Sequence, residues 1–368
     1  ESGLTQVLEM TLNGLMYAER KNYLDQSSSN KGNGYRKAFA VGLGKQIELN
    51  IPRDRLGMFQ PMVLALIRDQ QQQLEDLSFE LYTNGLTTSQ IGSLMKKIYG
   101  KHYSKSAISN ITSSFSSQME QWRNRALDAK YLAVYIDAIH LKIRRETVSS
   151  EAFYVILGVK EDYTREVLGI VNIPSESASG WKEVLASIKQ RGVEKIGLII
   201  SDNLTGLDTV IPLVYKMAKH QKCVVHLKRS ILNKVSANDK IAVAEDLKTV
   251  FDLDYSTDTL ELATLRLKVF SLKWSKKYRH IGNLSKNEMN ELYFTYILFN
   301  PKIWRIIYTT NWIERLNKVF RRTFKIRNSM PIDQSALTLI SKVAMDKEEG
   351  YMKYPIYMFK FEKKLNKL

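Results

Sequence analysis

The spacing of apolar and polar residues changes twice along the chain, from a helical pattern to a strand pattern and back. Between 71 and 128, apolar residues recur three and four positions apart in three short segments with turn signals between them, which predicts three helices. The third would open with small polar residues at Ser104 or Ser106. This arrangement is typical of a helix-turn-helix DNA-binding domain, and an ordinary helical bundle fits it equally well.

The middle of the chain has the composition of strands. Three runs rich in Val, Ile and Tyr are joined by short links, which predicts antiparallel neighbours; they cover 131–145, 152–160 and 165–173. After them the pattern predicts a helix at 175–192 and a buried strand at 195–201. A second helix is predicted at 207–220 and another buried strand at 223–227. This order predicts a mixed α/β fold with a ribonuclease H-like core.

The remaining segments complete a division into six parts. A polar, glycine-rich loop is expected at 26–36 and a short strand at 45–55, whereas 235–300 loses the strand pattern and predicts a helical insertion. Residues 1–70 are expected to form a dimerisation or DNA-binding arm, 71–130 the helix-turn-helix-like domain, and 131–234 the first part of the core. Residues 235–300 are the insertion, 301–335 the catalytic helix of the core, and 336–368 a basic tail.

Three acidic residues stand out by position. Asp137 is the one acid in the first core strand, where an unpaired carboxylate would be costly to bury. Asp202 directly follows the strand 195–201. Neighbouring parallel strands end at the same edge of a sheet, so these two side chains can converge there. Glu314 is the only acid among eight Lys and Arg between 302 and 327, on a helix that can return across that edge.

Converging carboxylates have a defined chemical use. Mg²⁺ prefers hard oxygen ligands, and two such ions about 3.5–4 Å apart activate a nucleophile and stabilise the leaving oxygen of a phosphodiester. Two of the acids also have a simpler explanation. Glu314 follows Asn311 by three residues, the spacing of a capping box, and Asp202 could cap the helix after it.

Composition points to a polyanionic partner. Lys and Arg number 55 against 38 Asp and Glu, a formal charge of +17, so nucleic acid is the first expectation and an anionic membrane surface the second. No apolar run reaches the ~18–20 residues of a membrane span, so we expect no membrane insertion. The first residues lack a secretory signal pattern. The single cysteine, Cys223, excludes an intramolecular disulfide and fits a reducing cytosol.

Cys223 and His226 have a C-x-x-H spacing. A structural zinc site needs about four ligands, and the chain has no further cysteine. We therefore expect Cys223 to be structural and His226 to contact phosphate or orient a carboxylate near the metal pocket.

Basic residues are expected to hold the DNA backbone. On the helix after Thr310, charged residues share one face and apolar residues the other. The expected DNA contacts around the site are His226, Lys228, Arg229, Trp312, Arg315, Lys318, Arg321, Arg322 and Lys325. Those expected from the third helix of the N-terminal region are Lys105, Ser106, Ser109 and Asn110.

Several separate motifs occur from about residue 45 onward. They are "IELNIPRDRLGMFQP", "LYTNGLTTSQIGSLMKKIYG", "YIDAIHLKIR", "LGVKEDYTREVLGI", "ISDNLTGL", "CVVHLKRS" and "IYTTNWIERLNKVFRR". In sequence and in order they resemble one family, the prokaryotic Mutator-like transposases of bacterial insertion sequences. The resemblance implies a DDE triad of Asp137, Asp202 and Glu314, dependence on Mg²⁺ or Mn²⁺, binding to terminal inverted repeats and target DNA, and a homodimer. It also implies a cytoplasmic, nucleoid-associated bacterial protein.

The sequence departs from the family pattern at two positions. Ala138 stands where glycine is common, and Trp312 stands where a small residue is expected. Trp312 could stack on an unpaired base or pack in the core.

The predicted function is that of a transposase that cuts the 3′ ends of its element and transfers them to target DNA. Two other functions stay open. One is a non-catalytic helix-turn-helix regulator, and the other is a ribonuclease H-like nuclease or resolvase that cuts without joining.

Overall fold

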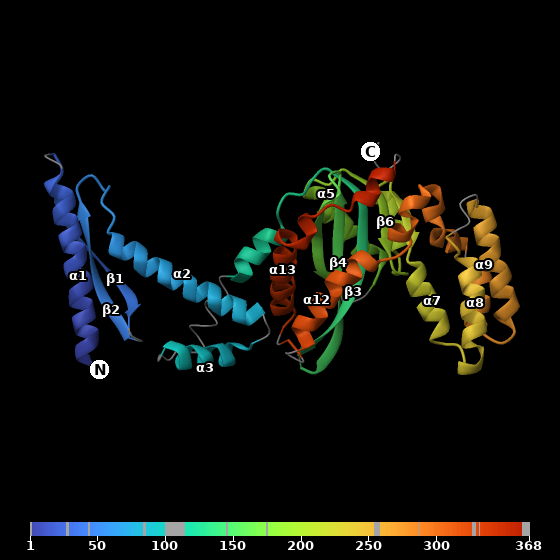
Figure 1. Cartoon of the computed structure of the whole chain (residues 1–368), viewed down its shortest axis with the longest axis horizontal. Helices are drawn as coiled ribbons and strands as arrows, with labels where there is room; N and C mark the ends of the chain where they lie inside the picture. The colour runs from blue at the N-terminus through green and yellow to red at the C-terminus, as the bar shows by residue number, and fades with distance from the viewer. Residues whose placement is uncertain are drawn as a thin grey trace. The chain divides into compact units, whose positions relative to one another are not determined.

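The computed structural model describes residues 2–362, except 27–28, 43–44, 84–85, 100–114, 145, 174–175, 254–257, 287, 326–328 and 331. The chain divides into two compact units, Glu1–Ser117 and Gln118–Leu368 (Figure 1). Each unit has its own hydrophobic core, so each is described separately.

The first unit begins with a helix packed on a two-stranded antiparallel sheet. The elements are α1 (Ser2–Asp25), β1 (Gly32–Gly42) and β2 (Lys45–Asp54). Their small core consists of Met16, Ile47, Leu49 and Ile51. The strand predicted at 45–55 is confirmed. The loop predicted at 26–36 is too long, because β1 already starts at Gly32 and pairs with β2 across a bulge after that residue.

Two helices follow in the first unit, α2 (Met62–Thr83) and α3 (Thr88–Tyr99). The start of α3 is a capping box: Thr87 N–H donates to Gln90 Oε1 at 2.8 Å, and Gln90 N–H donates back to Thr87 Oγ1 at 3.3 Å. The start of the predicted third helix lies outside the described residues, as do Lys105, Ser106, Ser109 and Asn110, whereas residues 115–123 are helical. The helix-turn-helix therefore stays a prediction.

The second unit is built on a five-stranded sheet with the order β5-β4-β3-β6-β7. The strands are β3 (Lys130–Arg144), β4 (Val148–Lys160), β5 (Arg165–Asn172), β6 (Lys195–Ser201) and β7 (Lys219–Lys222). The first three pair antiparallel, while β6 runs parallel to both β3 and β7. The predicted antiparallel trio and parallel neighbour are thus confirmed.

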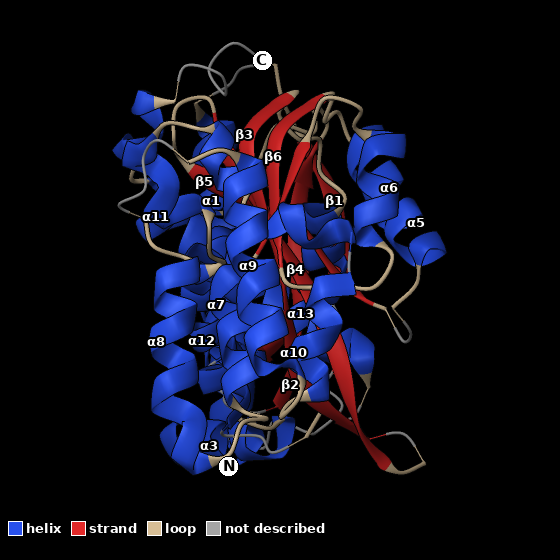
Figure 2. Ribbon diagram, turned by 90° about the vertical axis from the view of Figure 1, so that its right-hand side faces the viewer, coloured by secondary structure: helices blue, strands red, loops and turns tan. Residues whose placement is uncertain are grey.

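Helices cover both faces of this sheet (Figure 2). One face packs against α5 (Ala178–Gln190) and α6 (Leu207–Val214). The other packs against α7 (Val224–Leu232), α12 (Asn311–Lys325) and α13 (Asp333–Glu349). Burial on both faces explains why β3 and β6 are almost continuously apolar. An acid in such a strand must therefore be accommodated by the helices above it.

The strand predicted at 223–227 is wrong. β7 ends at Lys222, and α7 begins at Val224, with Cys223 as its N-cap residue. A short apolar run fits a strand or a helix equally well, and here Val224, Leu227 and Ile231 form one buried helical face. His226 therefore projects from a helix rather than from a core strand.

The described residues of 235–300 are mainly helical, as the pattern of this region predicts. It contains α8 (Lys240–Val250), α9 (Leu260–Ser275) and α10 (Arg279–Gly282), followed by short 3₁₀ turns. The short helix α11 (Trp304–Ile307) then leads into α12. After α13, the chain forms two 3₁₀ turns, Tyr351–Lys353 and Tyr357–Phe361.

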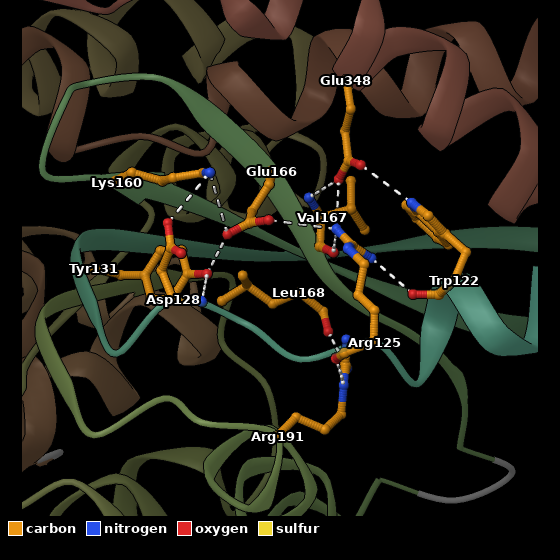
Figure 3. Close-up of polar contacts among 10 residues, drawn as sticks. All are labelled: Trp122, Arg125, Asp128, Tyr131, Lys160, Glu166, Val167, Leu168, Arg191 and Glu348. Atoms are coloured by element: carbon orange, nitrogen blue, oxygen red, sulfur yellow. Dashed lines mark hydrogen bonds and ion pairs between the residues drawn. The ribbon is translucent and has the colours of Figure 1, made fainter.

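A largely buried polar network fixes the start of the second unit to its C-terminal helix (Figure 3). Arg125 lies 3.0 Å from Glu348 on α13 and 3.5 Å from Glu166 on β5. Glu348 also accepts hydrogen bonds from the Val167 N–H, at 2.5 Å, and from the Trp122 indole, at 3.2 Å. Because every group in this set has a partner of opposite polarity, the network can be buried without leaving an unpaired charge.

Candidate active site

Strand register brings the first two acids to the same level of the sheet. In the parallel pair β3–β6, Ile136 lies opposite Ser201. Asp137 and Asp202 follow directly, so they lie next to each other just beyond the last residues that pair β3 with β6. Asp137 continues within β3, whereas Asp202 lies in the turn that follows β6.

Asp137 is buried, with 6% of its surface exposed. Its Oδ2 accepts a hydrogen bond from Nδ2 of Asn317 on α12 at 2.8 Å, and its Oδ1 accepts one from the Ala138 N–H at 2.9 Å. Burial raises the pKa of Asp137, the charge of Asp202 raises it further, and His226 and these two hydrogen bonds oppose the rise. Asp137 is thus a desolvated carboxylate beside a second carboxylate.

Asp202 is more accessible, with 40% of its side chain exposed. Its Oδ1 accepts a hydrogen bond from the Asn203 N–H at 2.7 Å. The N-cap residue of α6 is Gly206, so the alternative that Asp202 caps this helix is wrong. Its carboxylate is left to face α7.

Glu314 lies in the first turn of α12, and its side chain is 13% exposed. Its Oε1 accepts a hydrogen bond from Arg229 Nη1 at 3.1 Å and lies 3.5 Å from His226 Nε2. Both partners come from α7. The carboxylate is therefore engaged by the helix next to the sheet edge.

His226 links the other two acids. Its Nε2 faces Glu314, while its Nδ1 lies 3.8 Å from Asp202 Oδ2. The hydrogen bond with Cys223 raises the pKa of His226 to about 9, and the charges of Asp202 and Asp137 add to the rise against the cost of burial. The imidazole is therefore cationic at neutral pH and stabilises the carboxylates on either side of it.

The donor types at this site suit a hard divalent cation. Asp137 is destabilised by the charge of the neighbouring Asp202, and Oδ1 of the buried Asn317 has no hydrogen-bond partner. Carboxylate and amide oxygens are ligands that such a cation prefers. A dication would relieve the carboxylate repulsion. In the arrangement described, His226 bridges Asp202 and Glu314, and no three His, Cys, Asp or Glu side chains of the described residues are grouped closely enough to hold one metal ion.

The basic residues predicted to contact DNA fall into two groups. Those of α12 lie on its exposed side and are Arg315, Lys318, Arg321, Arg322 and Lys325. On α7, Arg229 pairs with Glu314, and Lys228 lies half-buried with its ammonium 5.3 Å from the Phe251 ring centroid. The exposed cations of α12 can meet a phosphate backbone, although Arg315 also contacts the Trp312 ring. The two cations of α7 have contacts within the protein.

Trp312 contacts two guanidinium groups within the protein. Its ring centroid lies 5.1 Å from the Arg165 guanidinium and 5.2 Å from that of Arg315. It is half-buried and packs against the core. These contacts fit the core-packing alternative, while base stacking by Trp312 stays a prediction.

Two residues behind the carboxylates went unnoticed in the sequence. Asn317 is fully buried on the apolar side of α12, and a polar residue in that stripe was the available signal. The other is His220, whose Nε2 lies 2.9 Å from Ser201 Oγ. That hydroxyl in turn donates to the main-chain oxygen of Asp202 at 2.8 Å. Only strand pairing brings His220 to this position.

Known proteins similar to this chain agree on one family. The family model described as "Transposase, Mutator family" matches residues 1–354. The chain belongs to the Mutator family of transposases. The resemblance inferred from the motifs is confirmed, and it extends further toward the N-terminus than about residue 45.

Two relatives support the assignment. The transposase for insertion sequence element IS905 of Lactococcus lactis subsp. lactis is 32% identical over 336 residues, which cover 91% of this chain and 84% of that protein. The transposase for IS1201 of Lactobacillus helveticus is 34% identical over 352 residues, covering 93% and 94%. The predicted function, an insertion-sequence transposase, is confirmed, and with it an enzyme that cleaves and transfers DNA.

Among solved structures, the Drosophila P element transposase strand transfer complex aligns with 80% of this chain and 83% of its own. The TM-score is 0.31 at 10% identity, which is too low to support a statement about a shared fold. None of the helices in the described part of the chain combines the length and the apolar character that a membrane span requires.

Proposed function

We propose that this chain is a DDE transposase with a ribonuclease H-like core, in which Asp137, Asp202 and Glu314 form the catalytic set. The sheet order β5-β4-β3-β6-β7 supports such a core, because three antiparallel strands are followed by two parallel ones. The observation that carries the proposal is the meeting of acids from β3, the end of β6 and α12 around His226.

The carboxylates would hold Mg²⁺ or Mn²⁺, with two ions per site. When bound, such ions lower the pKa of water and stabilise the charge on the leaving oxygen. The chain's own residues prepare the site for them. Asn317 and the Ala138 N–H orient Asp137. His226 contacts Asp202 and Glu314 and would keep them in place until they bind the metal ions.

The reaction would take place in two steps. Water attacks the phosphorus at the end of the element, and the 3′ oxygen leaves as a free 3′ hydroxyl. That hydroxyl then attacks a phosphorus of the target strand and displaces its 3′ oxygen, so one phosphodiester is exchanged for another.

We propose that terminal inverted repeats and target DNA are held by the exposed cations of α12 and by the first unit. Because each chain carries one carboxylate set and an element has two ends, a homodimer is the expected assembly. Its relatives are bacterial, so we propose that it acts in the cytoplasm, at the nucleoid.

The experiment that tests this function separates binding from cleavage. Asp202→Asn and Glu314→Gln should bind duplexes carrying the element ends as the wild type does, yet lose metal-dependent nicking. Glu183→Gln, an exposed acid on α5, serves as the matched control and should nick normally. Normal nicking by Asp202→Asn would contradict the mechanism.

The same assays discriminate between the alternatives. A non-catalytic regulator would bind the element ends without nicking them at any metal concentration. A nuclease or resolvase would nick them but would not join a pre-cut 3′ end to target DNA.

A further inference from the structure

The segment after α13 buries some of its side chains and exposes two aromatic rings. Met352, Ile356 and Phe359 are buried, with at most 5% of their surface exposed. Tyr354 and Tyr357 are each 64% exposed. A single exposed tyrosine needs no explanation, but these two lie three residues apart between buried anchors.

The backbone that carries the tyrosines is held in place. Nη2 of Arg165 donates to the main-chain oxygens of Tyr351 and Tyr354 at 2.8 and 3.0 Å. The Ile356 N–H donates to the Tyr163 main-chain oxygen at 2.8 Å. The rings therefore project from a fixed support, which lowers the entropy lost when a ligand stacks on them.

The exposed charged residues of this segment are lysines. Within 350–362, Lys353 and Lys360 are exposed, whereas Glu362 is buried and accepts a hydrogen bond from the Asn300 N–H at 2.6 Å. Lysine is depleted in protein–protein interfaces, although tyrosine is enriched there. Aromatic rings combined with cations are instead typical of sites for single-stranded nucleic acid.

Arg165 connects this surface with the candidate active site. Its guanidinium, which holds the segment from below, also lies 5.1 Å from the ring centroid of Trp312. Trp312 precedes Glu314 by two residues on α12. The segment that carries the tyrosines is thus connected, through the buried Arg165, to the start of the helix that carries a proposed metal ligand.

We propose that Tyr354 and Tyr357, with Lys353 and Lys360, form a binding site for single-stranded DNA. The two rings stack on unpaired bases, and the two ammonium groups neutralise the phosphates between them. The choice of DNA rather than RNA rests on the proposed function. The site would hold the strand that loses its partner where a DNA end is cut.

The test measures binding by the full chain in EDTA, so that no cleavage takes place. We expect Tyr354→Ala/Tyr357→Ala to weaken binding of a fluorescent oligo-dT about tenfold or more, since bases can no longer stack on the two rings. Binding of a blunt duplex of equal length should change less than twofold. Tyr354→Phe/Tyr357→Phe keeps the rings and should bind oligo-dT like the wild type.

Three results would overturn the proposal. They are unchanged oligo-dT binding by the alanine variant, an equal loss on oligo-dT and duplex, and a loss of self-association in sedimentation with oligo-dT binding intact. The last result would identify a protein interface instead. Failure of the proposed function would be seen separately: the wild-type chain would bind oligo-dT through the two rings but would not nick DNA.

Discussion

Nδ2 of Asn317 lies 2.8 Å from Oδ2 of Asp137, so a hydrogen bond to a candidate catalytic carboxylate joins α12 to the central strand. Asn317 stands three residues after Glu314, one turn along the same helix. One helix thus supplies one acid of the site and orients another. The position of Glu314 relative to Asp137 depends on this contact.

We expect Asn317→Ala to destabilise the chain by about 1.5–3 kcal/mol, because it removes a buried hydrogen bond to a charged group. Denaturant unfolding of the wild type, Asn317→Ala, Asp137→Ala and the double variant would measure the coupling between the two residues. Lys318→Ala, on the exposed side of the same turn, should stay within about 0.5 kcal/mol of the wild type. Additive single-variant effects would contradict the contact.

The exposed cations of α12 give a prediction about salt. Lys318→Ala/Arg321→Ala should weaken binding to any duplex and lower the slope of log K against log salt by about 0.9 for each phosphate that is no longer neutralised. Thermal stability should be unaffected because both side chains are exposed. Lys248→Ala on α8 removes an exposed lysine elsewhere and is the control. A slope equal to that of the wild type would show that these cations of α12 do not contact DNA phosphates.

The network around Glu348 gives a prediction about stability. Glu348→Ala leaves Arg125 short of a partner and the Val167 N–H without its acceptor, so we expect a loss of about 3 kcal/mol. Glu349→Ala changes the adjacent exposed residue and should be nearly neutral. Differential scanning calorimetry of the two variants provides the comparison. Equal midpoints would mean that the network does not stabilise the fold.

His220 gives a prediction about pH. Burial lowers the pKa of His220 to about 4, with Lys222 acting in the same direction and Asp208 opposing it. In the unfolded chain the residue is protonated as pH falls below about 6.5, but in the folded chain only as pH falls to about 4. The free energy of unfolding therefore decreases progressively as pH falls through that window. At about 1.4 kcal/mol per pH unit, the loss approaches ~3 kcal/mol.

The measurement is the free energy of unfolding between pH 7 and 4 for the wild type and His220→Asn. Asparagine cannot titrate there, and its amide can still donate to Ser201. The wild type should lose more stability than the variant over this range. Parallel curves would show that folding does not lower the pKa of His220.

The sequence determined four strands of the second unit, β3, β4, β5 and β6, and the acids on or directly after them. β3, β4 and β5 are long apolar runs with short links, so their antiparallel pairing follows from local composition. Asp137 could be singled out because an acid in such a strand needs a partner. Membership of the transposase family could also be predicted from the sequence, because each motif that supports it is a continuous stretch of residues.

Tertiary structure alone decided what surrounds those acids. The run from Cys223 to Leu227 is too short for its periodicity to separate a strand from a helix, and it became the start of α7 because Val224, Leu227 and Ile231 find a core to pack on. That choice places His226 between Asp202 and Glu314. Contacts of this kind join residues about 25 to 180 positions apart, and no local pattern encodes them, because they depend on which helix face is buried and on the register of strands.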